Sequence, residues 1–236
     1  MADEEVQLTG GRQRKGIVRV GDTVRRPMHR KSEFIHALLQ HFEAVGFDGA
    51  PRLLGIDDQG REILTYIEGQ VFVDPEDVGD PVRILDDAQL VSAAVLIRRF
   101  HDATAGTSLA ADAEVVCHSD LGQHNIIFVG DDARAIIDWD EDVAPGVRIL
   151  DFAHAVWCLA EVGEQGGAVE EQARRIRMVC DAYGWDDRAA VINEIEARFR
   201  RALAWHEKED KREGARIFSE MLDWIIAHRH ALKSHL

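Results

Sequence analysis

The side chains best suited to carry out chemistry lie between His118 and Asp138. Asp120 and Asn125 are five positions apart, and Asp138 follows 13 positions after Asn125. Transfer of a phosphoryl group from a nucleoside triphosphate needs a carboxylate that orients and deprotonates the acceptor hydroxyl, and oxygen ligands that hold Mg²⁺ on the transferred phosphate. These three side chains could meet both needs, so the stretch predicts phosphoryl transfer.

The spacing within this stretch matches the pattern of kinase catalytic loops, His-x-Asp-x-x-x-x-Asn, at His118, Asp120 and Asn125. Three matched positions alone would be a weak pattern. Asp138 makes the combination specific, because it follows an apolar strand at the end of a predicted β-hairpin. A second interpretation stays open, in which His118, Asp120 and His124 together bind a metal ion.

The chain before Gly69 is predicted to form strands and one helix. Gly21-Asp22 separates two β-branched runs and predicts a hairpin. Apolar residues at helical spacing follow Ser32, a candidate N-cap, as far as Gly46. In order, the expected elements are strands at 16–20 and 23–26, a helix at 32–46, and strands at 52–56 and 62–67.

After Gly69 the pattern becomes mostly helical. A helical face runs from Leu90 to His101. Further along, Gly130-Asp131-Asp132 separates two strand-like runs and predicts a second hairpin. About four helical patterns follow Leu150. We therefore predict an α+β protein with a small β-rich N-terminal lobe, residues 1–69, and a larger helical C-terminal lobe, residues 70–236.

Three segments resemble the core of the aminoglycoside phosphotransferase and choline kinase-like family: 118–128, 136–140 and 148–153. Residues 8–26 are similar to the nucleotide-covering strands of that family, and residues 66–69 to its interlobe hinge. The resemblance implies a protein-kinase-like bilobal fold. It also implies Mg²⁺-dependent transfer of the γ-phosphoryl group of ATP to a hydroxyl of a small molecule.

The resemblance further implies roles for single residues. Asp120 would be the catalytic aspartate, with His118 beside it as the brace of the catalytic loop. Asn125 and Asp138 would be the Mg²⁺ ligands. Asp151 would be a structural partner of the loop; alternatively it is a helix N-cap, because it stands directly before the helical pattern of residues 152–156.

The expected nucleotide site departs from the kinase pattern. There is no Gly-x-Gly-x-x-Gly, only Gly10-Gly11, which could also be an ordinary turn. Strand alternation makes Arg26 the candidate for the place of the kinase lysine, and Glu33 is the helical acid expected to pair with it. Arg26 could equally be a solvated strand-end residue, and Glu33 a first-turn acid favoured by the helix dipole. The hinge residues Tyr66 and Ile67 complete the expected ATP site.

The composition of the chain indicates which kinds of binding partner to expect. The formal charge of −15 disfavours binding to the phosphates of nucleic acids. No run approaches the ~18 apolar residues of a membrane span, and the acidic N-terminus is unlike a signal peptide, so a cytoplasmic protein is expected. Several acids beyond the catalytic region would suit a cationic acceptor, although they could also form a solvated face: Asp140, Glu141, Asp142, Glu161 and Glu164.

Two functions follow from these observations. The first is a small-molecule kinase that phosphorylates a hydroxyl of an aminoglycoside-like or amino-alcohol-like acceptor. A protein substrate is disfavoured, because the segment between Asp140 and Leu150 is too short for a protein-kinase activation segment. The second is a catalytically silent nucleotide-binding or scaffolding relative, suggested by Arg26 and the missing glycines.

Overall fold

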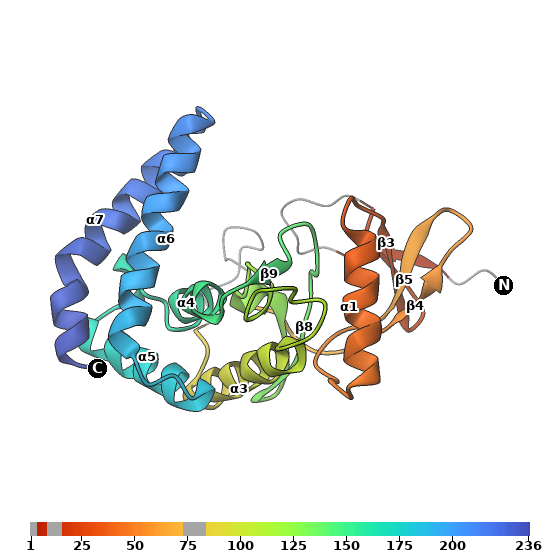
Figure 1. Ribbon diagram of the computed structural model, residues 1–236, viewed down its shortest axis with the longest axis horizontal. Helices are drawn as coiled ribbons and strands as arrows, with labels where there is room; N and C mark the ends of the chain where they lie inside the picture. Colours follow the sequence, from red (N-terminus) through yellow and green to blue (C-terminus); the bar gives the residue numbers. More distant parts are fainter. Residues whose placement is uncertain (1–3, 9–15, 73–83) are drawn as a thin grey trace.

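The N-terminal part of the chain forms an antiparallel sheet with one helix beside it (Figure 1). The computed structural model describes residues 4–8, 16–72 and 84–236. The strand order is β1-β2-β3-β5-β4. The predicted hairpin around Gly21-Asp22 is confirmed, because Val18 pairs with Arg25 across it. The elements are β1 (Glu5–Gln7), β2 (Val18–Val20), β3 (Thr23–Pro27), α1 (Ser32–Ala44), β4 (Leu53–Ile56) and β5 (Arg61–Thr65).

Helix α1 buries an apolar face at the spacing predicted from the sequence, with Ile35, Leu38 and Phe42 almost fully buried. The prediction that Ser32 is its N-cap is wrong. Lys31 is the N-cap and Ser32 is the first helical residue. The Ser32 hydroxyl instead accepts a hydrogen bond of 2.9 Å from the backbone N–H of His29, which shapes the turn before the helix.

Residues 66–69 lead from the sheet to the helical lobe. Directly after them, Gln70 forms an antiparallel bridge with Phe128, in which each backbone N–H donates to the other residue's carbonyl at 2.8 Å. This bridge ties the start of the second lobe to the hairpin that follows the catalytic loop. The lobe boundary after Gly69 stays a prediction.

The helical lobe contains the two short sheets and the remaining helices. Strands β7 and β8 form the predicted hairpin, and β6 pairs with β9. The four predicted C-terminal helices are confirmed as α4 to α7, with α6 beginning at Arg188 after Asp187 as its N-cap. None of the helices in the described ranges is both long and apolar enough to cross a membrane. The elements are α3 (Asp87–Thr104), β6 (Val115–Cys117), η1 (Gln123–Asn125), β7 (Ile126–Val129), β8 (Asp132–Ile136), β9 (Ala144–Gly146), α4 (Arg148–Leu159), η2 (Glu164–Gly166), α5 (Val169–Tyr183), α6 (Arg188–Lys208) and α7 (Arg212–Ser234).

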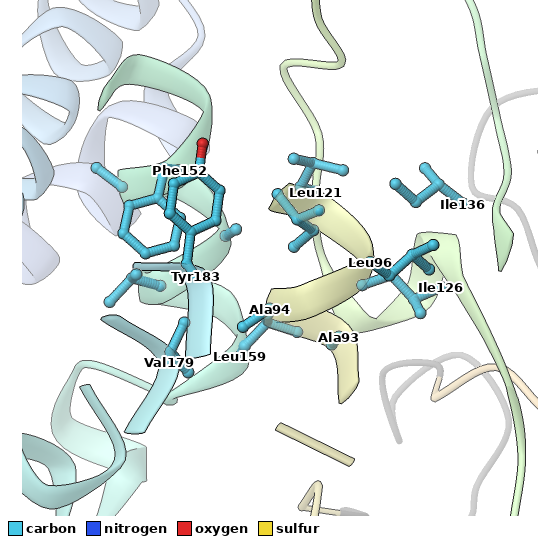
Figure 2. Packing of buried hydrophobic residues seen from close by; sticks show 14 of the residues in the cluster. Ala93, Ala94, Leu96, Leu121, Ile126, Ile136, Phe152, Leu159, Val179 and Tyr183 are labelled. Carbon is cyan, nitrogen blue, oxygen red and sulfur yellow. The ribbon is translucent and has the colours of Figure 1, made fainter. Parts of the chain in front are cut away.

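Helix α3 lies in the middle of the main core. It contacts α5 on one side and β8 on another. Figure 2 shows Ala94 and Leu96 of α3 between Phe152 and Tyr183, on the side of the helices, and Ile136 of the hairpin. The rings of Phe152 and Tyr183 stack with their centroids 4.0 Å apart. Helices α6 and α7 pack along each other and project away from this core (Figure 1).

Trp139 connects the core of the N-terminal lobe to the candidate site. Its side chain is 1% exposed, and its indole ring makes edge contacts with Phe42 of α1 at 5.2 Å and Phe100 of α3 at 5.0 Å between centroids. The indole N–H donates to the carbonyl of Ile136 at 2.8 Å. The segment that carries Asp138 is therefore anchored by the residue that follows it.

Candidate active site

Asp151 of α4 holds the start of the catalytic loop. Its carboxylate accepts hydrogen bonds from the backbone N–H groups of His118 and Ser119 at 2.8 and 2.7 Å, and from the His101 ring at 3.0 Å. Burial acts to raise the pKa of Asp151, but the hydrogen bond from His101 and the other donors hold this pKa below its ordinary value. The expected role as a structural partner is confirmed. The N-cap alternative is wrong, because α4 begins at Arg148 and its N-cap is Val147.

His118 joins the catalytic loop to the segment that carries Asp138. Its Nε2 donates to the carbonyl of Ile137 at 2.9 Å, and its ring contacts the Trp139 indole at 4.9 Å. Only 1% of the residue is exposed, so it braces the loop from inside. In the residues that the structure describes, no group of three or more His, Cys, Asp or Glu could hold a metal ion, so the metal-site alternative on His118, Asp120 and His124 is wrong.

Asp120 stands at the surface of this framework, with 48% of its side chain exposed. Its Oδ2 accepts from the Asn125 side-chain amide at 3.0 Å and lies 3.2 Å from His124 Nε2. Its Oδ1 lies 3.3 Å from Nε2 of His154. Partial burial acts to raise the pKa of Asp120, but the hydrogen bonds from His124 and His154 outweigh it and hold this pKa well below the ordinary value. Asp120 is therefore an ionised hydrogen-bond acceptor near neutral pH.

The β7–β8 hairpin brings Asp138 back toward Asn125, which is 13 positions earlier in the chain. The backbone N–H of Ile137 donates to the Asn125 carbonyl at 2.9 Å, which brings the following residue, Asp138, alongside. The Asn125 amide donates to the Asp120 carbonyl at 2.9 Å, so the amide nitrogen is used within the loop. Asp138 is exposed and makes no hydrogen bond or ion pair with the described residues. Two oxygen donors of this kind fit a Mg²⁺ ion that also binds phosphates.

Arg26 is buried in the N-terminal lobe and has a partner that the sequence did not indicate. It is 5% exposed, and its Nε donates at 2.7 Å to Glu62, which stands directly opposite on β5. The other Glu62 oxygen lies 3.0 Å from the His36 ring. The predicted pairing with Glu33 is wrong, because Glu33 is exposed on the solvent side of α1. The alternative that Arg26 is a solvated strand-end residue is wrong as well.

The two hinge residues, Tyr66 and Ile67, differ in whether their backbone groups are already hydrogen-bonded. The backbone N–H of Tyr66 donates to Asp22 at 2.9 Å, and the Arg19 guanidinium lies 3.7 Å above the Tyr66 ring. Within the described part of the chain, Ile67 makes no backbone hydrogen bond, so its N–H and carbonyl can receive a ligand. A cavity of about 410 Å³ borders both hinge residues, but Arg26, Asp120, Asn125 and Asp138 do not line it. Gly10 and Gly11 lie outside the described residues.

Two residues of the site were missed by sequence analysis. His154 follows Asp151 by three positions, which places both on one face of α4, toward the catalytic loop. That spacing could have revealed it. Arg198 of α6 donates to the carbonyl of Ser119 at 3.3 Å, and burial lowers the pKa of this arginine. Nothing local to Arg198 in the sequence indicates this contact.

The similarities to known proteins agree with this geometry. A family model described as "Phosphotransferase enzyme family" matches residues 83–191, which contain the catalytic loop, Asp138 and Asp151. The trifolitoxin immunity protein of Rhizobium leguminosarum bv. trifolii is 28% identical, over 99% of this chain and 99% of that protein.

Solved structures with a similar fold include two aminoglycoside phosphotransferases. The GDP complex of wild-type aminoglycoside 2'-phosphotransferase-IIIa has a TM-score of 0.58 at 12% identity, covering 94% of this chain and 92% of that one. The gentamicin complex of APH(2")-IIa has a TM-score of 0.57 at 14% identity, covering 93% and 90%. The predicted kinase-like bilobal fold is confirmed. The resemblance to the aminoglycoside phosphotransferase and choline kinase-like family is confirmed over residues 83–191, and the same family model supports the prediction of a phosphotransferase enzyme.

Proposed function

We propose that this phosphotransferase is a small-molecule kinase, which transfers the γ-phosphoryl group of ATP to a hydroxyl of a small, cationic acceptor. The observation that carries the proposal is the convergence of three oxygen-bearing side chains, those of Asp120, Asn125 and Asp138, on one framework. Buried contacts of Asp151, His118 and Trp139 hold that framework. Phosphoryl transfer depends mainly on such positioning and on electrostatic stabilisation.

In the proposed reaction, the oxygen of the acceptor hydroxyl attacks the γ-phosphorus, and the Asp120 carboxylate accepts the proton of that hydroxyl. The bond between the γ-phosphorus and the bridging oxygen breaks, and ADP leaves. The products are ADP and a phosphate monoester, and Asp120 then returns the proton to solvent. Asn125 and Asp138 would hold Mg²⁺, which neutralises charge on the β- and γ-phosphates when bound.

A cationic acceptor is supported by the acidic turn beside the catalytic loop. Ser119 Oγ donates to the backbone carbonyl of Asp142 at 3.1 Å, so the turn of Asp140, Glu141 and Asp142 adjoins Asp120. Glu141 is 3.8 Å from Arg30, which offsets part of this charge. Gentamicin binds the similar enzyme APH(2")-IIa, and the name of the relative from Rhizobium adds a toxin to the acceptors worth testing.

The experiment is a nucleotide-consumption assay on the purified protein with a panel of aminoglycosides, amino alcohols, sugars and trifolitoxin, the toxin in the name of the Rhizobium relative. ATP and GTP are compared, because a similar structure holds GDP. A thermal shift with each nucleotide and Mg²⁺ is measured beside it, since a bound ligand raises the melting temperature. Nucleotide-dependent phosphorylation of a panel member supports the proposal, and absence of both binding and consumption contradicts it.

A silent relative is the second candidate, and the Arg26–Glu62 pair favours it. Arg26 is only 5% exposed and is held inside the N-terminal lobe by Glu62, so little of its guanidinium is open to a phosphate. Nucleotide binding without turnover against the whole panel would identify this second function.

Arg26 gives a prediction about the nucleotide. If it contacts a phosphate, Arg26→Ala should weaken ATP binding by roughly tenfold or more, since a hydrogen bond to a charged group contributes about 1.5–3 kcal/mol. Arg25→Ala is the matched control, because Arg25 lies on the opposite face of β3 beside Asp57. Calorimetry measures both affinities below the melting temperature of each variant, since Arg26→Ala leaves Glu62 without its ionic partner. Equal effects at both positions would show that the phosphates do not bind on the face of Arg26.

A further inference from the structure

Three side chains of the protein contact the two oxygens of the Asp120 carboxylate. Asn125 and His124 both approach Oδ2, at 3.0 and 3.2 Å. His154 approaches Oδ1 alone, at 3.3 Å. A carboxylate oxygen has two lone pairs, so the donors on Oδ2 occupy both of them, whereas Oδ1 keeps one free. The free lone pair on Oδ1 is the place where an acceptor hydroxyl can donate its proton.

His154 is suited to hold Oδ1 because it is buried and uncharged. It is 4% exposed, and burial lowers its pKa although the hydrogen bond to Asp120 acts in the opposite direction. Its Nε2 faces the carboxylate, so the neutral tautomer with the proton on this nitrogen can donate to Oδ1. Its Nδ1 is buried with no hydrogen-bond partner in the described part of the chain. The polar contacts of this ring are therefore made by Nε2, with Asp120 Oδ1 at 3.3 Å and with Cys158 Sγ at 3.5 Å.

The row of Cys158, His154 and Asp120 is not a nucleophilic triad. Cys158 Sγ lies 3.5 Å from the same Nε2 that faces Asp120, whereas a triad histidine contacts its nucleophile and its carboxylate through different ring nitrogens. Burial raises the pKa of the Cys158 thiol to about 12, so it stays protonated. The histidine therefore does not activate Cys158 as a nucleophile.

His124 reaches Oδ2 because residue 122 is a glycine. A Cβ built on Gly122 would come within 2.3 Å of His124 Cε1 and 2.5 Å of its Nδ1. The ring is folded back over the loop backbone at this point. Gly122 has φ −88° and ψ 164°, which an alanine adopts without strain, so its missing side chain makes room for the imidazole.

We propose that His154 and His124 are positioning residues, which hold the Asp120 carboxylate from its two oxygens and direct the free lone pair of Oδ1 toward the acceptor hydroxyl. Gly122 permits the contact of His124. This inference rests on the proposed function, because it assigns Asp120 the hydroxyl proton. Both imidazoles contact the Asp120 carboxylate, and in this inference both act through it.

The test separates kcat from KM in the variants His154→Ala, His154→Gln and Gly122→Ala. A lost hydrogen bond to a charged group corresponds to about a tenfold change or more, so His154→Ala and Gly122→Ala should each lower kcat by about that factor and leave the KM for ATP unchanged. His154→Gln should recover much of the rate, because its amide can donate to the same oxygen. His230→Ala, an exposed histidine on α7, is the matched control.

A double variant tests whether Gly122 acts through His124. If the alanine only displaces the ring, Gly122→Ala combined with His124→Ala should be no slower than His124→Ala alone. A Cβ at Gly122 would meet first the exposed His124 ring, so Gly122→Ala remains informative if His154→Ala fails to fold. An unchanged kcat in Gly122→Ala and in a folded His154 variant would overturn this inference. Transfer by the wild type would still support the proposed function.

A readout without turnover keeps the inference testable if the wild type transfers no phosphoryl group. The NMR signals of the His154 imidazole should shift when Asp120→Asn removes the carboxylate, because the present contact raises the pKa of that ring. Signals unchanged by this substitution would overturn the contact itself. Shifted signals in a protein that consumes no nucleotide would leave the contact standing and reject its catalytic purpose.

Discussion

Asp120→Asn is expected to lower phosphoryl transfer by about 10²- to 10⁴-fold, the range of general-base and positioning roles. The amide keeps the shape of the side chain but cannot accept the proton of the acceptor hydroxyl. The NH₂ group of the asparagine takes the place of one carboxylate oxygen, and it can donate but not accept. It therefore faces a donor in either orientation: His154 in one, or Asn125 and His124 in the other. Both effects act on the transfer step.

Binding of ATP and Mg²⁺ should change little in the same variant, because the proposed metal ligands are Asn125 and Asp138. Calorimetry measures that binding, and transfer is measured with an acceptor found in the panel or, failing one, as slow hydrolysis of ATP. Asp112→Asn, an exposed aspartate outside the site, is the matched control. Full transfer by a folded Asp120→Asn protein would require the kinase interpretation of this loop to be abandoned.

The catalytic loop could be predicted from the sequence because its chemistry is local. His118, Asp120 and Asn125 lie within eight positions, and their side chains are brought together by one turn and a short 3₁₀ helix. The place of Asp138 was predictable for a related reason, since a tight hairpin returns the chain to its starting point. Residue types at fixed spacing are enough where the connecting chain is short.

The partner of Arg26 could not be predicted, because it depends on the pairing of two strands that are distant in sequence. Arg26 and Glu62 are 36 residues apart and meet only when β3 pairs with β5 in this register. Alternation within one strand assigns a face but says nothing about the residue opposite. The helix start at Ser32 failed on a smaller scale, because a serine near a helix terminus can bond to the preceding turn as well as cap the helix.

Replacing Asp138 with asparagine should remove the activity almost completely and raise the Mg²⁺ concentration that the remaining activity requires. A metal ion contributes several kcal/mol to the stabilisation of transition-state charge, and each 1.36 kcal/mol is a factor of ten in rate. A loss of about 10²-fold or more at moderate Mg²⁺ concentration follows. The activity is measured as a function of Mg²⁺ at saturating ATP.

The fold of Asp138→Asn should remain intact, which makes the variant a clean test. Asp138 has φ +61°, and asparagine tolerates this left-handed conformation better than other residues except glycine. The carboxylate is exposed and makes no hydrogen bond or ion pair with the described residues, so its loss leaves no buried group unpaired. Asp131→Asn makes the same change of charge in the turn at the other end of the hairpin, and it should leave the Mg²⁺ dependence unaltered. If Asp138→Asn and Asp131→Asn showed the same Mg²⁺ dependence as the wild type, Asp138 would not be a ligand, and the metal would have to be held without the hairpin.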